Sequence, residues 1–351
     1  MKVLKNVILG ERLTDVTVES GKIISIDKTS YSGENCNGLK IYPGLIDIHS
    51  HGCIGFDTMD EENHLKEMSA FQLKHGITAW YPTTMTMAKE DIVRATTRDI
   101  NFEDGAGIEG FHLEGPFINP KRKGAQDGKF IFRPDLSFIS ECKNIKMVTL
   151  APELPGSKAF IENYDGVISL GHTDADYETA MGAFRVGAKC LTHAFNAMPS
   201  IHHRDPGPLV AAYDSGAYVQ IIADGKHIHP SVIRMYISAV GEERVILISD
   251  SMRATGLGDG EYTLGGGKVL VKDGTAYTED GVLAGSTSTL FDCVRCAISM
   301  GIKEESAVKM ASENPARLMG LNKGKIAVGY DADFILVDDN FNLVKTLKYS
   351  V

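Results

Sequence analysis

Short apolar runs alternate with amphipathic stretches along most of the chain. Eight of these runs have the length and composition of buried strands, and most of the stretches between them have the period of a helix. The expected strands are residues 45–51, 77–82, 107–113, 145–150, 167–170, 189–192, 218–223 and 245–249. The expected helices are residues 61–75, 88–100, 157–163, 176–187, 231–240 and one that begins near Ser288. Eight strands in this alternation predict an α/β fold, a (β/α)8 TIM-like barrel.

The two ends of the chain have a different pattern. Residues 1–42 alternate short β-like runs with turn residues, and the segment 19–22 has the composition of a hairpin turn. A similar alternation returns in residues 324–338. The pattern predicts a small β-sandwich domain built from residues 1–42 and 320–351, and a barrel domain of residues 43–319.

A glycine-rich segment follows the eighth expected strand. It runs from residue 254 to 285 and contains β-like pieces at 268–271 and 275–278. Long connections within a compact domain are uncommon and often functional, and the functional loops of a barrel gather at one end of it. We therefore expect this segment to lie over the barrel mouth and to face a substrate.

Composition and charge narrow the class of protein. The 351 residues, 43% of them hydrophobic, are enough for one large core. The formal net charge of −10 argues against nucleic acid or an anionic membrane as the partner. The N-terminus lacks the apolar core of a signal peptide, and no apolar run reaches the roughly 18 residues that a membrane span needs. These features predict a cytoplasmic enzyme with a small-molecule substrate.

Several of the expected strands end in residues that can bind a metal ion. His49 and His51 project from one face of the first strand, at its C-terminal end. Other strands end in, or are soon followed by, four more such residues: Glu114, His172, His193 and Asp250. The C-terminal ends of parallel barrel strands converge on one mouth, so these side chains are expected to meet there. Taken singly, each could instead be a satisfied core residue.

The order of these residues predicts two adjacent metal sites. One would be built from Glu114, His172 and His193, and the other from His49, His51 and Asp250. Imidazole and carboxylate ligands suit zinc and iron equally, so we expect one or two divalent ions per chain, zinc or iron. A divalent ion polarises a carbonyl and lowers the pKa of a bound water, and both effects favour hydrolysis of an amide.

Asp250 is also the candidate for proton transfer. At the end of the eighth expected strand its carboxylate would face the mouth, where it can take a proton from water and return it to an amide nitrogen. The alternative is that Asp250 only binds metal or caps a loop. His112 lies on the same strand face as Glu114 and is expected to orient a metal ligand from behind.

Longer blocks of sequence resemble known enzymes. The first strand resembles that of the amidohydrolase superfamily in Ile46-Asp47-Ile48-His49-Ser50-His51-Gly52 and in residues 57–60. Further blocks resemble the N-acetylglucosamine-6-phosphate deacetylase family: residues 112–119, 123–125, 171–173, 192–198, 203–207, 223–227 and 249–250. The resemblance implies hydrolysis of the acetamide of N-acetyl-D-glucosamine 6-phosphate to D-glucosamine 6-phosphate and acetate. It also implies a role in amino sugar catabolism and cell-wall sugar recycling.

The resemblance implies roles for loop residues around the mouth. Arg204 matches the family's phosphate-binding arginine, and a planar guanidinium pairs bidentately with phosphate oxygens. Asn196 and Ala197 match positions that hold the phosphate end, and His227 matches a histidine that contacts the sugar. Further substrate contacts implied by the matching blocks are Ala125, Asp224, Gly225, Lys226, Leu283, Ala284 and Gly285.

Two features depart from, or vary within, this family. Many relatives have histidine where this chain has Gln126; glutamine can donate a hydrogen bond to the acetyl carbonyl but cannot take a charge. Some relatives lack the first-strand histidine pair and use one metal, whereas this chain keeps both histidines, which leaves a two-metal site open. The family's members form dimers, so a homodimer is expected, in which His202 and His203 could add to the phosphate site.

Two other functions stay open at this point. A dihydroorotase-like amidase would share the barrel and the histidine pair, but such enzymes commonly bridge their metals through a strand lysine, where this chain has Glu114. A non-catalytic sugar-phosphate-binding protein on the same scaffold is the other alternative. The presence of Asp250 together with all the expected metal ligands argues against it.

Overall fold

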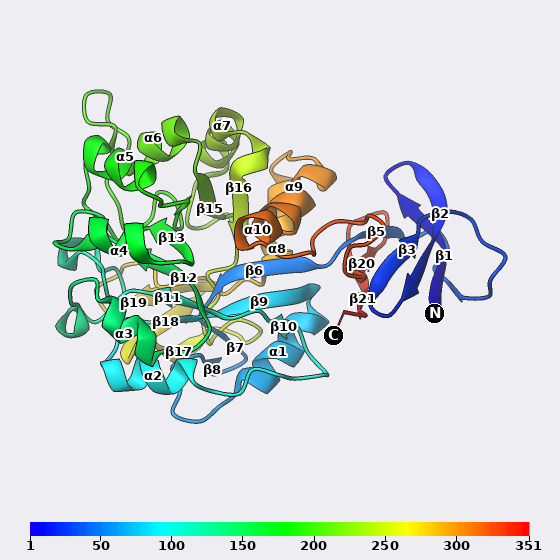
Figure 1. Cartoon of the computed structure of the whole chain (residues 1–351), viewed down its shortest axis with the longest axis horizontal. Helices are drawn as coiled ribbons and strands as arrows, with labels where there is room; N and C mark the ends of the chain where they lie inside the picture. The colour runs from blue at the N-terminus through cyan, green and yellow to red at the C-terminus, as the bar shows by residue number, and fades with distance from the viewer. Residues whose placement is uncertain (351) are drawn as a thin grey trace.

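A parallel barrel dominates the computed structural model, which describes residues 1–350 (Figure 1). Neighbouring strands pair in chain order, and a bridge between Ser50 and Ser251 joins the last strand's end to the first. The barrel strands are β6 (Leu45–Ser50), β9 (Ile77–Thr84), β11 (Phe111–Glu114), β12 (Ile145–Leu150), β13 (Val167–Leu170), β14 (Cys190–Leu191), β15 (Tyr218–Ile222) and β16 (Val245–Ile248). The barrel predicted from the sequence pattern is confirmed.

Apolar side chains fill the barrel and attach the helices to it. One buried cluster contains Ile46, Ile48, Met147 and Ile246 and lies inside the barrel. Neighbouring residues of the same strands, such as Leu247, belong to a second cluster that packs against the helices. This alternation follows from the period of two along a strand, so runs that are apolar at every position are buried on both faces.

Helices surround the barrel, and more of them form than the sequence pattern indicated. Residues 157–163 form a helix as predicted, whereas residues 136–141, 207–215, 304–310 and 313–319 were not recognised as helical. The helices are α1 (Leu65–Lys74), α2 (Lys89–Thr96), α3 (Leu136–Glu141), α4 (Ser157–Asn163), α5 (Tyr177–Arg185), α6 (Gly207–Ser215), α7 (Pro230–Val240), α8 (Leu290–Ser299), α9 (Glu304–Met310) and α10 (Glu313–Met319), with short 3-10 turns η1 (Pro120–Arg122), η2 (Gly128–Phe130) and η3 (Glu242–Arg244).

The third expected strand, residues 107–113, is interrupted. Its first part is β10 (Gly107–Ile108), which pairs with β9, and its second part is β11. Between them the chain bends at Gly110, whose φ is 139°. A Cβ at this position would lie 2.4 Å from Cγ of Lys146, so the close approach needs glycine.

The chain ends form a second, mixed sheet beside the barrel (Figure 1). It contains seven strands in which β5 pairs with both β1 and β20, so the N-terminal and C-terminal segments are joined. Their bounds are β1 (Lys2–Leu9), β2 (Arg12–Glu19), β3 (Lys22–Ser25), β4 (Glu34–Asn35), β5 (Lys40–Pro43), β20 (Asp333–Val337) and β21 (Leu343–Lys348). Side chains from both segments share one buried cluster, as the expected small β domain requires. The domain boundaries themselves stay a prediction.

Two smaller sheets lie outside the barrel ladder. Residues Gly52–Cys53 (β7) and Phe56–Asp57 (β8) form a short hairpin directly after the first barrel strand. The glycine-rich segment contains β17 (Gly260–Leu264), β18 (Gly267–Lys272) and β19 (Thr275–Thr278) in one antiparallel sheet. The two β-like pieces expected there are confirmed, and the third strand was missed.

Within residues 1–350, none of the helices combines the length and the apolar character needed to cross a lipid bilayer.

Candidate active site

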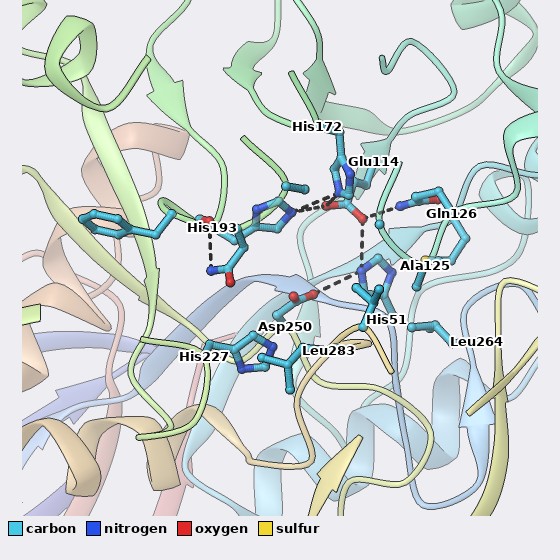
Figure 2. Close-up of a pocket in the computed structure, with 17 residues that line it drawn as sticks. His51, Glu114, Ala125, Gln126, His172, His193, His227, Asp250, Leu264 and Leu283 are labelled. Atoms are coloured by element: carbon cyan, nitrogen blue, oxygen red, sulfur yellow. Dashed lines mark hydrogen bonds and ion pairs between the residues drawn. The ribbon is translucent and has the colours of Figure 1, made fainter. Parts of the chain in front are cut away.

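A cavity of about 320 Å³ opens at the C-terminal ends of the barrel strands (Figure 2). Most of the residues expected from the sequence line it: His51, Glu114, Ala125, Gln126, His172, His193, Asn196, Ala197, His227, Asp250, Leu283 and Gly285. Its lining also includes residues that sequence reasoning missed: Met85, Gly124, Phe195, Leu264 and Val282. The glycine-rich segment contributes Leu264, Val282, Leu283 and Gly285, so the expectation that it lies over the barrel mouth is confirmed.

Glu114 presents its two carboxylate oxygens to different histidines. Oε1 lies 3.0 Å from Nε2 of His193 and 3.3 Å from Nε2 of His172. Oε2 lies 3.3 Å from Nε2 of His51, and Nε2 of His49 is 3.2 Å from Oε1. These atoms form two groups that could hold a metal ion, His49–His51–Glu114 and Glu114–His172–His193. Glu114 belongs to both groups, which is the geometry of a bridging ligand.

The second ring nitrogen of most of these histidines is held by a fixed partner. Nδ1 lies 3.1 Å from the Gln220 side-chain oxygen in His49, 3.2 Å from the Thr83 carbonyl in His51, and 2.8 Å from the Arg122 carbonyl in His172. These partners are acceptors, so in the neutral ring Nδ1 carries the proton, which leaves the Nε2 lone pair to face a metal ion. His193 differs, because its buried Nδ1 has no partner among the described residues.

Asp250 lies next to the His49–His51–Glu114 group, at the cavity. Its Oδ1 is 3.3 Å from Nε2 of both His49 and His51, and Figure 2 shows its carboxylate directed toward His51. Burial alone would raise the pKa of Asp250, but the positive charge of protonated His49 and His51, in the absence of a metal ion, lowers it to about 2. Asp250 is therefore ionised at neutral pH and can accept a proton.

Three of the residues expected to bind metal or transfer a proton adopt an uncommon backbone conformation. The φ angles of His172, His193 and Asp250 are 46°, 26° and 48°, in the left-handed region that side chains with a Cβ seldom occupy. Each of them stands two residues beyond the end of a barrel strand. Such strain persists only where the surrounding structure fixes it, and it concentrates at functional positions.

His112 is buried behind the cavity and contacts His49. Its Nδ1 lies 3.0 Å from the Ile48 carbonyl and its Nε2 2.7 Å from Oγ1 of Thr149. Burial lowers the pKa of His112 well below its usual value, so the ring is neutral. The His112 ring packs edge-on against His49 at a centroid distance of 4.6 Å, which is consistent with the expected role in orienting a ligand.

His227 lines the cavity and pairs with Asp224. Nδ1 of His227 lies 2.7 Å from Oδ2 of Asp224, and Figure 2 shows the His227 ring next to Asp250. Burial alone would lower the pKa of His227, but its hydrogen bond to Asp224 raises it. Asp224, Gly225, Lys226 and Ala284 do not line the cavity themselves, although the Lys226 ammonium donates to the Gly274 carbonyl of the glycine-rich segment.

Gln126 contacts Glu114 inside the cavity. Its side-chain nitrogen donates to Oε2 of Glu114 at 2.7 Å. One of its two N–H groups is therefore engaged by a metal-site carboxylate, which the sequence did not indicate. The expected contact between Gln126 and an acetyl carbonyl stays a prediction.

Arg204 lies on an exposed loop and does not line the cavity. Its Nη1 is 2.6 Å from Nε2 of the adjacent His203, and its backbone N–H donates to Nδ1 of His202. Among the described residues that line the cavity, none is arginine or lysine. Any strong positive charge for an anionic substrate must therefore come from outside this lining.

Comparison with known proteins agrees with the fold and the site. The model of the amidohydrolase family matches residues 41–350. The N-acetylglucosamine-6-phosphate deacetylase of Lysinibacillus sphaericus is 36% identical over 95% of this chain and 92% of its own length. The N-acetylgalactosamine-6-phosphate deacetylase of Escherichia coli O157:H7 is 31% identical over 93% of this chain and 91% of its own.

A solved structure shows the same architecture. It is a mutant of the N-acetyl-D-glucosamine-6-phosphate deacetylase of Mycobacterium smegmatis in complex with N-acetyl-D-glucosamine-6-phosphate. The TM-score is 0.93 at 30% identity, and the match covers 99% of this chain and 98% of the other. With the barrel, the histidine and carboxylate groups at its mouth, and these matches along almost the whole sequence, the chain belongs to the amidohydrolase family.

Proposed function

We propose that the protein hydrolyses the acetamide of N-acetyl-D-glucosamine 6-phosphate to D-glucosamine 6-phosphate and acetate. The observation that carries this proposal is the convergence of His51, His172 and His193 with Glu114 and Asp250 at one cavity, with His49 buried directly behind them. Two named deacetylases of phosphorylated amino sugars align over more than nine-tenths of the chain. Amino sugar catabolism and cell-wall sugar recycling are the processes that such a reaction would serve.

The donor set fits a divalent metal ion. The amidohydrolase family is metal-dependent, and both groups consist of imidazole nitrogens and a carboxylate, which suit zinc and iron. Nitrogen and oxygen donors that lie about 3 Å apart, as these do, would repel one another unless protons or a cation lay between them. When bound here, a divalent ion would polarise the acetyl carbonyl and make water more acidic.

The chain's own residues supply the proton transfer. Asp250 takes a proton from the water that adds to the acetyl carbon, and then gives it to the sugar nitrogen as the carbon–nitrogen bond breaks. Acetate and the free amine are the products. In this proposal His227, which lies next to Asp250 and pairs with Asp224, and the backbone around Asn196 and Ala197 hold the sugar phosphate.

Release of acetate from purified protein tests the proposed function. The substrates to compare are N-acetylglucosamine 6-phosphate, its galactosamine epimer and unphosphorylated N-acetylglucosamine. A clear preference for the first supports the proposal, whereas a preference for the epimer would move the assignment to the galactosamine enzyme. Absence of acetate with all three, in protein loaded with zinc or iron, would favour a non-catalytic binding protein. Hydrolysis of a cyclic amide such as dihydroorotate, in place of these three substrates, would favour a dihydroorotase-like amidase.

Arg204→Ala is expected to impair use of the phosphorylated substrate severely and to change use of the unphosphorylated sugar little. A charge-assisted bidentate contact to a desolvated partner is worth roughly 2 to 5 kcal/mol, which corresponds to at least about 30-fold in kcat/KM. Lys123→Ala removes another positive charge near the mouth and serves as the control, with a much smaller expected effect. Equal losses on both substrates would indicate a folding defect or another role for Arg204.

The position of Arg204 leads us to propose a homodimer. An exposed arginine that does not line its own cavity could reach the cavity of a partner subunit, together with His202 and His203. Mixed dimers of an Arg204→Ala chain and an Asp250→Asn chain test this proposal. If Arg204 acts across the interface, the site with an intact Asp250 receives an intact Arg204 and activity returns. Failure of complementation in mixed dimers would assign Arg204 to its own chain.

The cytoplasm is the compartment that we propose for the enzyme.

His49 and His51 are expected to hold a second ion that shares Glu114. Changing His49 to Asn and His51 to Gln together should lower the metal content by about one ion per chain, because the other site keeps its ligands Glu114, His172 and His193. Elemental analysis of protein purified without chelators measures this. A matched control changes His64 and His75, which lie outside the cavity, and should keep the stoichiometry. An unchanged metal content in the first variant would mean that His49 and His51 are structural.

A further inference from the structure

Gln126 is a buried side chain with two strong partners. Only 2% of the residue is exposed. Its side-chain nitrogen donates to Oε2 of Glu114 at 2.7 Å, and its side-chain oxygen accepts from the backbone N–H of Thr86 at 2.6 Å. Gln126 therefore links the loop after β11 to the end of β11 and to the segment after β9.

The partners fix which end of the amide faces which way. The Thr86 N–H can only donate and the Glu114 carboxylate can only accept, so the oxygen of Gln126 must face Thr86 and its nitrogen must face Glu114. Another side chain at position 126 could make both contacts only if it had a donor for Glu114 and an acceptor for Thr86. These two groups would have to be about as far apart as the nitrogen and oxygen of a carboxamide.

The orientation of the Glu114 carboxylate matters because its two oxygens serve different histidines. The terminal torsion of a glutamate side chain has a broad preference, so the side chain alone does not fix the plane of the carboxylate. Among the described residues, Gln126 is the only donor to this carboxylate that is not one of the four histidines. Histidines that gave their Nε2 lone pairs to a bound metal ion could not also fix the carboxylate by donating hydrogen bonds to it from Nε2.

The same loop holds a second member of the site. The Arg122 carbonyl accepts from Nδ1 of His172 at 2.8 Å, and the Asn119 N–H donates to the His172 carbonyl at 2.9 Å. Gly124 has a φ of 55° and packs against the His172 ring, where an added Cβ would lie 3.5 Å from Cε1. One loop thus positions His172 through its backbone and Glu114 through Gln126.

We propose that Gln126 is a positioning residue that fixes the plane of the Glu114 carboxylate, so that Oε2 faces His51 while Oε1 faces His49, His172 and His193. This inference rests on the metal binding in the proposed function, but not on the identity of the substrate. It predicts that a side chain able to bridge Glu114 and Thr86 preserves the metal site. It also predicts that a side chain unable to do so weakens the site even when the fold is intact.

Zinc affinity tests the proposal directly, without an activity assay. Zinc is removed from each protein and returned in competition with a chromophoric chelator at neutral pH. Gln126→Ala is expected to bind zinc roughly 10- to 100-fold more weakly than the parent, the usual loss when a partner behind a metal ligand is removed. Gln126→Asn is one methylene shorter, cannot span both partners and should show a similar loss. It replaces the alanine variant in the comparison if that variant does not fold.

Two further variants separate positioning from general packing. Gln126→His offers one N–H donor and one ring-nitrogen acceptor at a similar spacing, so it should keep the affinity within a few-fold of the parent. Gln72→Ala removes another glutamine that is 2% exposed but touches Ser50 rather than Glu114, and should also leave zinc affinity nearly unchanged.

The outcomes divide clearly. Unchanged affinity in Gln126→Ala, an equal loss in Gln72→Ala, or a loss in Gln126→His as large as in the alanine variant would each overturn the positioning role. A parent protein that binds no zinc or iron would instead refute the metal site on which the proposed function depends.

Discussion

Asp250→Asn is expected to lower kcat by at least about 100-fold while metal content and substrate affinity stay close to those of the parent. General acid–base catalysis by a positioned side chain contributes roughly 10²- to 10⁴-fold, and asparagine keeps the shape of aspartate but has no transferable proton. An amide nitrogen leaves poorly as an anion, so the loss of the group that protonates it affects the bond-breaking step directly.

The surroundings of Asp250 make this substitution informative. The carboxylate contacts the histidine pair through one oxygen, at 3.3 Å from each Nε2. Its low pKa keeps it ionised, which is the form that the proposed proton transfer from water requires. Steady-state kinetics and elemental analysis of the same preparation give the two quantities that must be compared.

A matched control uses another aspartate. Asp176 caps helix α5 by accepting from the Thr179 N–H at 2.8 Å, and asparagine is an equally good residue at that position. Asp176→Asn should therefore leave both kcat and metal content unchanged. Near-normal kcat in Asp250→Asn would refute the proton-transfer role, and loss of an ion would show that Asp250 is a metal ligand first.

Removal of the metal ions is expected to abolish activity. Charge stabilisation by a bound divalent ion is worth several kcal/mol, and each 1.36 kcal/mol is a factor of ten, so a loss of roughly a thousandfold or more is expected. Dialysis against a chelator, followed by titration with zinc or with ferrous iron under anaerobic conditions, measures the loss and its recovery. The number of ions per chain needed for full recovery of activity shows whether one metal site must be occupied or both, the sites being His49–His51–Glu114 and Glu114–His172–His193.

The result that would contradict this expectation is a fully active protein that elemental analysis finds free of metal. A control with the chelator already saturated by zinc separates removal of the ion from any direct effect of the chelator. Recovery with zinc and iron alike would follow from a donor set of imidazole and carboxylate.

The barrel and the centre of its mouth could be predicted from the sequence because both depend on simple periodicity. Strands such as 145–150 and 167–170 are apolar at nearly every position and were placed correctly. Once the strands are parallel, residues just beyond their C-terminal ends must meet. Glu114, His172 and Asp250 therefore converge although they are far apart in the sequence.

Other features depend on loop conformation, for which the sequence carried a weaker signal. Helix α6 begins with glycine and proline, so it was not recognised, although proline is well tolerated in the first turn of a helix. The partners behind the site, Gln220 for His49 and Gln126 for Glu114, are set by the paths of different strands and loops. A glutamine in a sequence gives no indication of which of many acceptors and donors it will reach.

The pairing of β5 with β20 has a consequence for synthesis on the ribosome. Tyr42 and Ile335 are paired across this sheet. Strand β5 therefore cannot pair with β20 until the whole barrel has been translated. At typical rates of about 5 to 20 residues per second the delay is on the order of 15 to 60 s. During this time the edge of β5 that later pairs with β20 is open to other extended segments. Chaperones that cover exposed strand edges are therefore expected to act on the nascent N-terminal segment, before the chain is released.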